Sequence, residues 1–266
     1  MSIPYSQDIF GVLHEKSPYK WDKHLAHVSM PEGSFFTTFL EARHRILDKL
    51  LKKTGVKNIL EVAAGFTPRG LKWTEDDLVQ YVELDLPSKS KEKWEVIDNL
   101  AFPRCSTGIR CNLHLEGGDA LDEYDFERAV SFLGDGPIAI VNEGFLRYLT
   151  HEEKSVLALN VRRTLEECGG YWITPDINII DPRLKDPRLK SYNDQLQSEL
   201  GMDVTPNLFD SVSEARGFFE SLGFAVEVHS LKEILADMFS PRRLDLPMNK
   251  VENFIGQKVA FVMRLT

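Results

Sequence analysis

Short apolar runs alternate along the chain with longer segments whose apolar residues recur every three or four positions. The short runs have the composition of buried strands and lie at residues 58–64, 78–87, 111–119, 137–144, 171–179, 225–231 and 258–265. The longer segments have the spacing of amphipathic helices and lie at residues 39–55, 88–100, 123–134, 150–170 and 211–224. The pattern predicts strands and helices in alternation up to about residue 225, followed by a β-rich end.

Two helix boundaries carry specific capping signals. Thr150 and Glu153 have the spacing of a capping box, and the glycines at 169–170 follow the last turn of the same segment. Ser88 or Ser90 is the residue type that caps the helix expected after the second strand. These signals favour helices over alternative assignments of the same apolar residues.

The alternation is typical of an α/β fold with helices on both faces of a largely parallel sheet. We therefore predict a doubly wound, mostly parallel sheet of seven strands within residues 41–266. Residues 1–40 are rich in aromatic side chains, which are scarce in disordered segments, and we expect a helical cap there. The direct repeat DPRLKDPRLK at 181–190 is too short for an architectural repeat, so we expect a surface loop.

Composition limits the classes of function. The formal net charge of −9 over 266 residues argues against a nucleic-acid binder, which usually presents a basic face. No apolar stretch approaches the roughly 20 residues of a membrane span, and the N-terminus lacks the pattern of a signal peptide. The three cysteines have no metal-ligand spacing and indicate free thiols. These features predict a cytoplasmic protein without membrane or nucleic-acid partners.

Acidic residues stand at the ends of the first four predicted strands. They are Glu61, Asp85, Asp119 and Glu143, and Gly65 lies in the turn after the first strand. In doubly wound sheets, ligands bind beyond the carboxyl ends of the strands. The absence of a Cβ on Gly65 permits close approach, and an acid about twenty residues later is the usual partner of ribose hydroxyls. The combination predicts a nucleoside site.

A nicotinamide-dependent enzyme is the obvious competing interpretation. It requires G-x-G-x-x-G, so that a pyrophosphate can sit on a helix N-terminus. Here the turn reads AAGFTPRG at residues 63–70, the first glycine is missing, and Pro68 and Arg69 occupy its tight section. A nucleoside ligand without a pyrophosphate fits this turn better.

The segments ARHRILDKLL, ILEVAAGFTPRGL, YVELDLP, GGDALD and NEGFLRYLT together resemble a known family. The chain is similar to class I S-adenosylmethionine-dependent methyltransferases of the leucine carboxyl methyltransferase-like family, in the branch of bacterial polyketide-type O-methyltransferases. The resemblance covers about residues 41–155, and NEGFLRYLT is its most specific part. It implies S-adenosyl-L-methionine as cofactor, S-adenosyl-L-homocysteine as product, and a Rossmann-like methyltransferase domain.

The resemblance assigns roles to the residues at the first two strand ends. Arg43 matches the arginine that pairs with the cofactor carboxylate, a task that suits a guanidinium because it grips carboxylates with two bonds. Gly65 matches the glycine under the cofactor, with Glu61 behind it near the methionine amino group or the amides of the turn. Asp85 matches the ribose-binding acid.

The resemblance also assigns residues after the third and fourth strands. The segment Gly118, Asp119, Ala120 and Leu121 matches the part that holds the adenine, and Glu143 matches the acid near the methionine moiety. A further family residue, an N-terminal lysine or arginine, has no definite counterpart among Lys16, Lys20 and Lys23.

The acceptor site is assigned to Tyr148 and Arg147. Tyr148 matches the family's aromatic residue at the mouth of that site. Arg147 stands where many relatives carry an apolar residue, so it indicates either an acidic acceptor or a surface arginine. A carboxylate acceptor needs no general base, whereas a hydroxyl needs one within hydrogen-bond reach. The candidates for such a base are His24, His27, His151 and Asp176.

Three functions follow from this interpretation. The first is methyl transfer to an oxygen, carboxylate or hydroxyl, of a small molecule. The second is carboxyl methylation of a protein C-terminus, which needs an open groove. The third is a non-catalytic paralogue that binds S-adenosylmethionine. No metal is expected, because the histidines and acids lack ligand spacing. The sequence does not specify the oligomeric state.

Overall fold

A computed structural model describes residues 3–16, 31–100, 110–180 and 204–266. The repeat at 181–190, the histidines at 24 and 27, and the lysines at 20 and 23 lie outside these ranges, and the side chain of Lys16 is not described. No helix in the described part of the chain is long and apolar enough to cross a membrane.

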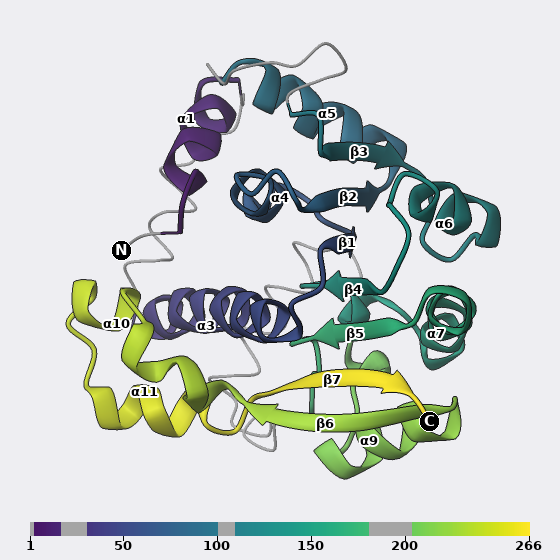
Figure 1. Ribbon diagram of the computed structural model, residues 1–266. Helices are drawn as coiled ribbons and strands as arrows, with labels where there is room; N and C mark the ends of the chain where they lie inside the picture. The colour runs from purple at the N-terminus through teal and green to yellow at the C-terminus, as the bar shows by residue number, and fades with distance from the viewer. Residues whose placement is uncertain (1–2, 17–30, 101–109, 181–203) are drawn as a thin grey trace.

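The centre of the molecule is a seven-stranded sheet with the order β3-β2-β1-β4-β5-β7-β6, seen in Figure 1. Its strands are β1 (Asn58–Val62), β2 (Gln80–Asp85), β3 (Leu113–Gly117), β4 (Ile138–Asn142), β5 (Gly170–Thr174), β6 (Phe224–Ser230) and β7 (Val259–Leu265). The first five strands pair in parallel, and β7 is antiparallel to both β5 and β6. The predicted doubly wound, mostly parallel sheet is confirmed.

Helices cover both faces of the sheet. They are α1 (Ser6–Lys16), α3 (Pro31–Thr54), α4 (Arg69–Trp73), α5 (Pro87–Asp98), α6 (Glu123–Val130), α7 (His151–Cys168), α9 (Val212–Ser221), α10 (Ser240–Arg243) and α11 (Met248–Ile255). Buried residues of α3, α4, α5 and α11 pack on one face, and those of α6, α7 and α9 pack on the other. The expected boundary at residue 40 falls inside α3, which is continuous through it.

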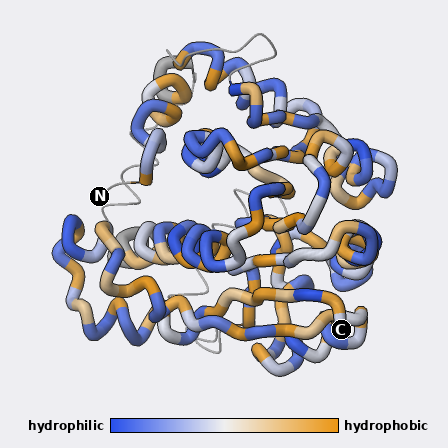
Figure 2. The backbone as a smooth tube through the Cα atoms, in the orientation of Figure 1, coloured by the Kyte–Doolittle hydropathy of each residue, from blue (hydrophilic) through white to orange (hydrophobic). Residues whose placement is uncertain are grey.

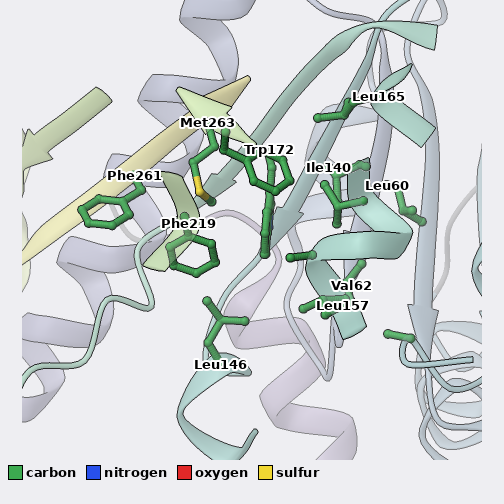
Figure 3. Close-up of a cluster of buried hydrophobic side chains, with 14 of the residues drawn as sticks. Leu60, Val62, Ile140, Leu146, Leu157, Leu165, Trp172, Phe219, Phe261 and Met263 are labelled. Atoms are coloured by element: carbon green, nitrogen blue, oxygen red, sulfur yellow. The ribbon is translucent and has the colours of Figure 1, made fainter. Parts of the chain in front are cut away.

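Two apolar cores result from the alternation of side chains along the strands. Figure 2 shows hydrophobic residues along the central strands and hydrophilic residues on the outer helices. Figure 3 shows the core under α7 and α9, where Trp172 packs edge-on against Phe219 with ring centroids 5.3 Å apart. Trp172 also donates a bond of 2.8 Å to Asn142, so its indole nitrogen is satisfied inside the core.

The predicted boundaries of one helix are confirmed and those of another are wrong. The capping box of Thr150 and Glu153 is present at α7, and Gly169 forms the C-cap. By contrast, α5 begins at Pro87, whose missing N–H costs nothing in the first turn, and no side chain caps it. Ser90 instead donates 2.7 Å to the carbonyl of Glu116, linking α5 to β3.

The β-rich end expected after residue 225 is correct for β6 and β7 but not for the segment between them. That connection contains a 3-10 helix, η4 (Leu231–Asp237), followed by α10 and α11. Leu231, Ile234, Val251 and Ile255 are buried in the core that contains α3. The segment is therefore helical because its apolar residues pack against a helix and not within the sheet.

The strand order reverses between β1 and β4, which lie side by side in parallel register. The chain leaves β1 toward β2 on one side and leaves β4 toward β5 on the other. Such a switch point opens a crevice at the carboxyl ends of the two strands. Glu61 lies near the end of β1 and Glu143 directly follows β4.

Candidate cofactor and acceptor site

A cavity of about 670 Å³ lies at this switch point. It is lined by Ile3, Ser6, Thr37, Leu40, Glu41, His44, Glu61, Ala63, Ala64, Gly65, Phe66, Thr67, Pro68, Glu143, Gly144, Phe239 and Ser240. The lining residues come from the N-terminal segment with α1, from α3, from the turn after β1, from the end of β4, and from the start of α10. Figure 1 shows α1, α3, α4 and α10 bordering the same side of the sheet.

The turn after β1 forms the floor of the cavity. Ala63 and Gly65 both have positive φ values, of 52° and 50°, a region that side chains with a Cβ seldom occupy. Ala63 is held in place by its amide, which donates 2.7 Å to the carbonyl of Leu84 on β2. A Cβ built on Gly65 would meet no atom within 4 Å, so this glycine faces open space. The backbone is therefore accessible to a ligand at Gly65, as predicted.

Asp85, the last residue of β2, connects this turn to its neighbours. One carboxylate oxygen accepts a hydrogen bond of 2.6 Å from the amide of Gly65, and the other accepts a hydrogen bond of 2.7 Å from the amide of Leu86. The carbonyl of Asp85 accepts 2.8 Å from the amide of Gly118. The structure thus brings together three parts of the predicted site, and each carboxylate oxygen of Asp85 accepts one hydrogen bond from the described residues.

The loop after β3 has the compact form that its glycines and acids suggest. A Cβ on Gly118 would lie 2.9 Å from the side chain of Asp125, so the position has no room for a larger residue. Asp119 donates its amide to Asp125 and accepts 2.9 Å from the amide of Leu121. The carbonyl of Ala120 accepts from Asn160 on α7. This loop lies beside Asp85 and does not line the cavity.

Glu61 is buried with two side-chain partners, neither of which the sequence analysis predicted, and they take the place of the turn amides expected there. The side chain of Glu61 accepts a short bond from Arg69 and a bond of 2.7 Å from the hydroxyl of Tyr81. Arg69 is fully buried at the start of α4. The neighbouring Glu61 raises the pKa of Arg69 well above its usual value although burial alone lowers it. A buried carboxylate in an apolar strand is the sequence signal that such a partner must exist.

Glu143 stays ionised although it is largely buried. Burial raises the pKa of its carboxyl, but the ring of His44 and the guanidinium groups of Arg69 and Arg43 lower that pKa to about 2. Arg69 donates 2.6 Å to Glu143, and Arg43 lies 3.5 Å away. The cavity wall therefore presents an ionised carboxylate, paired with arginines behind it, at the end of β4.

Arg43 stands on α3, behind Glu143 and Gly144. Its guanidinium lies 3.5 Å from Glu143 and 3.7 Å from Asp176, and its Nε is buried without a hydrogen-bond partner among the described residues. Arg43 does not line the cavity, but these long contacts leave donor capacity on its guanidinium behind Gly144, which does. The residue fits the cofactor carboxylate that the resemblance assigns to it, since an anion there would satisfy donors that the protein leaves unused.

Asp176 has a structural task and is not free to act as a base. Its carboxylate accepts bonds from the side chain of Asn142 and from the amides of Gly144, Phe145 and Leu146, at 2.6–3.3 Å. It thus holds the turn that presents Glu143.

His151, another candidate base, begins α7. Its ring lies 4.9 Å from that of Phe209 and 5.7 Å from that of Phe218, outside the residues that line the cavity.

The predicted acceptor residues lie in the 3-10 helix η1 (Leu146–Tyr148). The guanidinium carbon of Arg147 is 5.8 Å from the ring centre of Tyr148, and the Arg147 Nε is buried without a hydrogen-bond partner in the described part of the chain. Neither residue lines the cavity. Their role in acceptor binding stays a prediction.

Glu83 is the other acid near the end of β2, but it has a different environment from Asp85. It is buried against Lys93 of α5, and burial raises the pKa of Glu83 to about 7. Neither the Glu83–Lys93 pair nor Asp85 lines the cavity, but Asp85 bonds the amide of Gly65, which does, so Asp85 is the ribose candidate of this strand. Within the described ranges, no three His, Cys, Asp or Glu side chains group as metal ligands.

Comparison with solved structures shows the same fold. The chain matches the pyocyanin biosynthetic protein PhzM with 16% identity and a TM-score of 0.50, over 97% of this chain and 62% of that one. It matches the mycolic acid cyclopropane synthase CmaA1, in complex with S-adenosylhomocysteine and CTAB, with 17% identity, a TM-score of 0.50 and 83% of each chain. It matches an O-methyltransferase family protein from Burkholderia thailandensis with 14% identity and a TM-score of 0.50, over 99% of this chain and 68% of that one.

The chain thus spans 62% of the length of PhzM. A search of curated proteins finds no match to its sequence. The family model for leucine carboxyl methyltransferase matches residues 12–161, a range that contains α3, the turn after β1, Asp85 and Glu143. The chain therefore belongs to the leucine carboxyl methyltransferase family of S-adenosylmethionine-dependent methyltransferases.

Proposed function

We propose that the protein transfers a methyl group from S-adenosylmethionine to an oxygen atom of an uncharged small molecule. Family membership supplies the methyl transfer and the cofactor. The choice of acceptor rests on the charge of the cavity wall. This choice favours a hydroxyl over a carboxylate, which are the two acceptor groups compatible with the sequence.

The observation that carries this proposal is the lining of the cavity, which exposes carboxylates to a ligand while the arginines that pair with them lie behind the wall. Glu41, Glu61 and Glu143 line it, and none of the described lining residues is a lysine or arginine. Bonds from Ser240, Phe239 and Arg45 outweigh burial and lower the pKa of Glu41, so this group is ionised near neutral pH. These carboxylate oxygens attract the cationic cofactor, whereas an anionic acceptor would meet them with no lysine or arginine among the described lining residues, and like charges in contact cost several kcal/mol.

The proposal assigns each part of the cofactor to a residue or loop of this chain. The ribose hydroxyls are assigned to Asp85, which bonds the amide of Gly65, and the adenine to the loop at 118–121 beside it. Arg43 has donor capacity for the carboxylate, and Glu61 and Glu143 present acceptors for the ammonium group. Each assignment is part of the proposal.

Once bound, S-adenosylmethionine supplies a methyl group attached to a sulfonium sulfur. When the methyl group is transferred, this sulfur becomes a neutral thioether. The residues of this chain then have to align the acceptor and exclude water; well-oriented reactants reach effective molarities of roughly 10⁵–10⁸ M. Leu40, Phe66 and Phe239 give the cavity apolar walls suited to that task.

The acceptor hydroxyl must also lose its proton, and this requirement narrows the class of acceptor. His44 is the imidazole among the described lining residues, and its ring nitrogens lie 2.9 Å from Arg69 and 3.4 Å from Asp48. Both nitrogens are therefore engaged. A phenolic hydroxyl ionises near pH 10 and is a stronger acid than an aliphatic alcohol, so its proton can pass to an ionised carboxylate of the wall, such as Glu41, as the methyl group is transferred, and a phenol is the acceptor class that we propose.

The test is a transfer assay with S-adenosylmethionine that carries a labelled methyl group. Matched phenols and benzoic acids, a peptide ending in leucine and fractionated small-molecule extracts serve as acceptors. We expect label in small molecules that survives alkali, as an ether does. Label that alkali releases as methanol, or label in the peptide, would show a carboxylate acceptor and contradict the proposal. Cofactor binding without any transfer would favour the non-catalytic paralogue.

A further inference from the structure

Arg69 contacts four side chains behind the cavity, although it does not line the cavity itself. It is 1% exposed and lies at the start of α4. Its Nε donates 2.8 Å to Asp48 and one terminal nitrogen donates to Glu61. The other terminal nitrogen lies 2.6 Å from Glu143 and 2.9 Å from His44. One guanidinium thus joins α3, β1 and the end of β4.

The partners of Arg69 differ in where they face. Glu61 and Glu143 line the cavity, whereas Asp48 lies outside it. The two glutamates each have a second anchor, the Tyr81 hydroxyl at 2.7 Å from Glu61 and Arg43 at 3.5 Å from Glu143. Each carboxylate is consequently held from behind, and its orientation toward the cavity depends on Arg69.

The electrostatic need for this cation follows from the same contacts. Two carboxylates that share a buried site cannot both remain ionised without a counter-charge, because each disfavours the charged form of the other. Arg69 lies between them and is a planar fork with donors in fixed directions. A lysine supplies the same charge but only a single point, so it cannot direct both carboxylates at once.

We propose that Arg69 is a positioning residue for the amino-acid end of the cofactor. It holds Glu61 and Glu143 side by side and ionised, so that their remaining lone pairs receive the cofactor's ammonium group. The inference rests on the proposed cofactor site and extends it to a residue behind the wall. It also accounts for an arginine in the tight section of a turn where a pyrophosphate-binding motif would need glycine.

The experiment compares two ligands that differ in the amino-acid tail. S-Adenosylhomocysteine carries the tail, and 5′-methylthioadenosine shares the adenosine and sulfur but lacks it. Calorimetry gives the dissociation constant of each for the wild type and for Arg69→Lys. We expect Arg69→Lys to weaken the binding of S-adenosylhomocysteine roughly ten- to a hundredfold, the effect of losing charged hydrogen bonds. The binding of 5′-methylthioadenosine should weaken less than about threefold.

A matched control is the double variant Glu83→Gln with Lys93→Met, which removes another buried ion pair beside the same sheet but outside the cavity. It should leave the ratio of the two dissociation constants unchanged. Equal weakening of both ligands by Arg69→Lys, or no weakening, would overturn the inference.

A second variant serves if Arg69→Lys does not fold, as judged by circular dichroism. Asp48→Asn removes the charge of a partly exposed partner of Arg69. It should weaken the binding of S-adenosylhomocysteine roughly three- to tenfold and leave the binding of 5′-methylthioadenosine unchanged. An unchanged ratio in Asp48→Asn would then refute the role of Arg69. A wild type that binds neither ligand would instead refute the cofactor site itself.

Discussion

Asp85 has two tasks at once in this structure. Its carboxylate fixes the turn after β1 through the amide of Gly65, and its backbone carbonyl fixes the loop after β3 through Gly118. Its carboxylate oxygens, which accept from the amides of Gly65 and Leu86, are also the ones proposed to receive the ribose hydroxyls. Substitution of this residue should therefore affect the adenosine part of the cofactor, whereas Arg69 should affect only its amino-acid tail.

Asp85→Asn keeps the size of the side chain but replaces one acceptor oxygen with a donor. We expect both S-adenosylhomocysteine and 5′-methylthioadenosine to bind roughly ten- to a hundredfold more weakly, because hydrogen bonds to a charged group are worth about 1.5–3 kcal/mol. Calorimetric titration measures both constants.

Asp122→Asn is the matched control for this substitution. Asp122 also accepts a backbone amide, that of Asp125 at 2.9 Å, but at the N-cap of α6 and away from the cavity. Asparagine and aspartate cap helices about equally well, so this variant should bind both ligands normally. An Asp85→Asn protein with wild-type affinity would mean that Asp85 serves the turn alone.

At the scale of the elements, β5 pairs with β4 through a glycine at its first position. Gly170, its first residue, has a φ of 118°, and a Cβ placed there would lie 2.0 Å from the carbonyl oxygen of Ile138 on β4. β4 also carries Asn142 and presents Glu143, so a shift of its backbone to make room for a Cβ would disturb the site. This glycine therefore sets the spacing of β4 and β5 below the site.

Gly170→Ala should lower the free energy of unfolding by about 2–5 kcal/mol, from backbone strain together with overpacking. Gly217→Ala is the matched control, since Gly217 lies within α9 and a Cβ there meets nothing within 4 Å. That substitution should stabilise the protein by about 0.4–1 kcal/mol. Urea denaturation measures both changes, and two variants of equal stability would disprove the close contact.

At the scale of the whole molecule, sequence patterns sufficed for the parts that depend on local spacing. The strands followed from apolar runs, the ends of α7 from its capping box and glycine, and the crevice from the alternation of strands and helices. These features are encoded within a few residues of each other, so they can be recognised without knowing the tertiary structure.

The parts that depend on contacts between distant elements were not predictable in the same way. Glu61 required a cationic partner, but the choice of Arg69 among many arginines depends on how α4 sits over β1. The role of Asp176 depends on amides contributed by a turn thirty residues earlier in the chain. Likewise, the helices between β6 and β7 form because α3 offers an apolar surface there.

The central claim is that a methyl-transfer cofactor binds at the switch point between β1 and β4. The most direct measurement is calorimetric titration of the full chain with S-adenosylmethionine, S-adenosylhomocysteine and NAD. The glycine turn, Asp85 and the carboxylates of the cavity predict saturable one-to-one binding of both adenosyl ligands and no heat with NAD. Binding of NAD, or the absence of heat with either adenosyl ligand, would contradict the account.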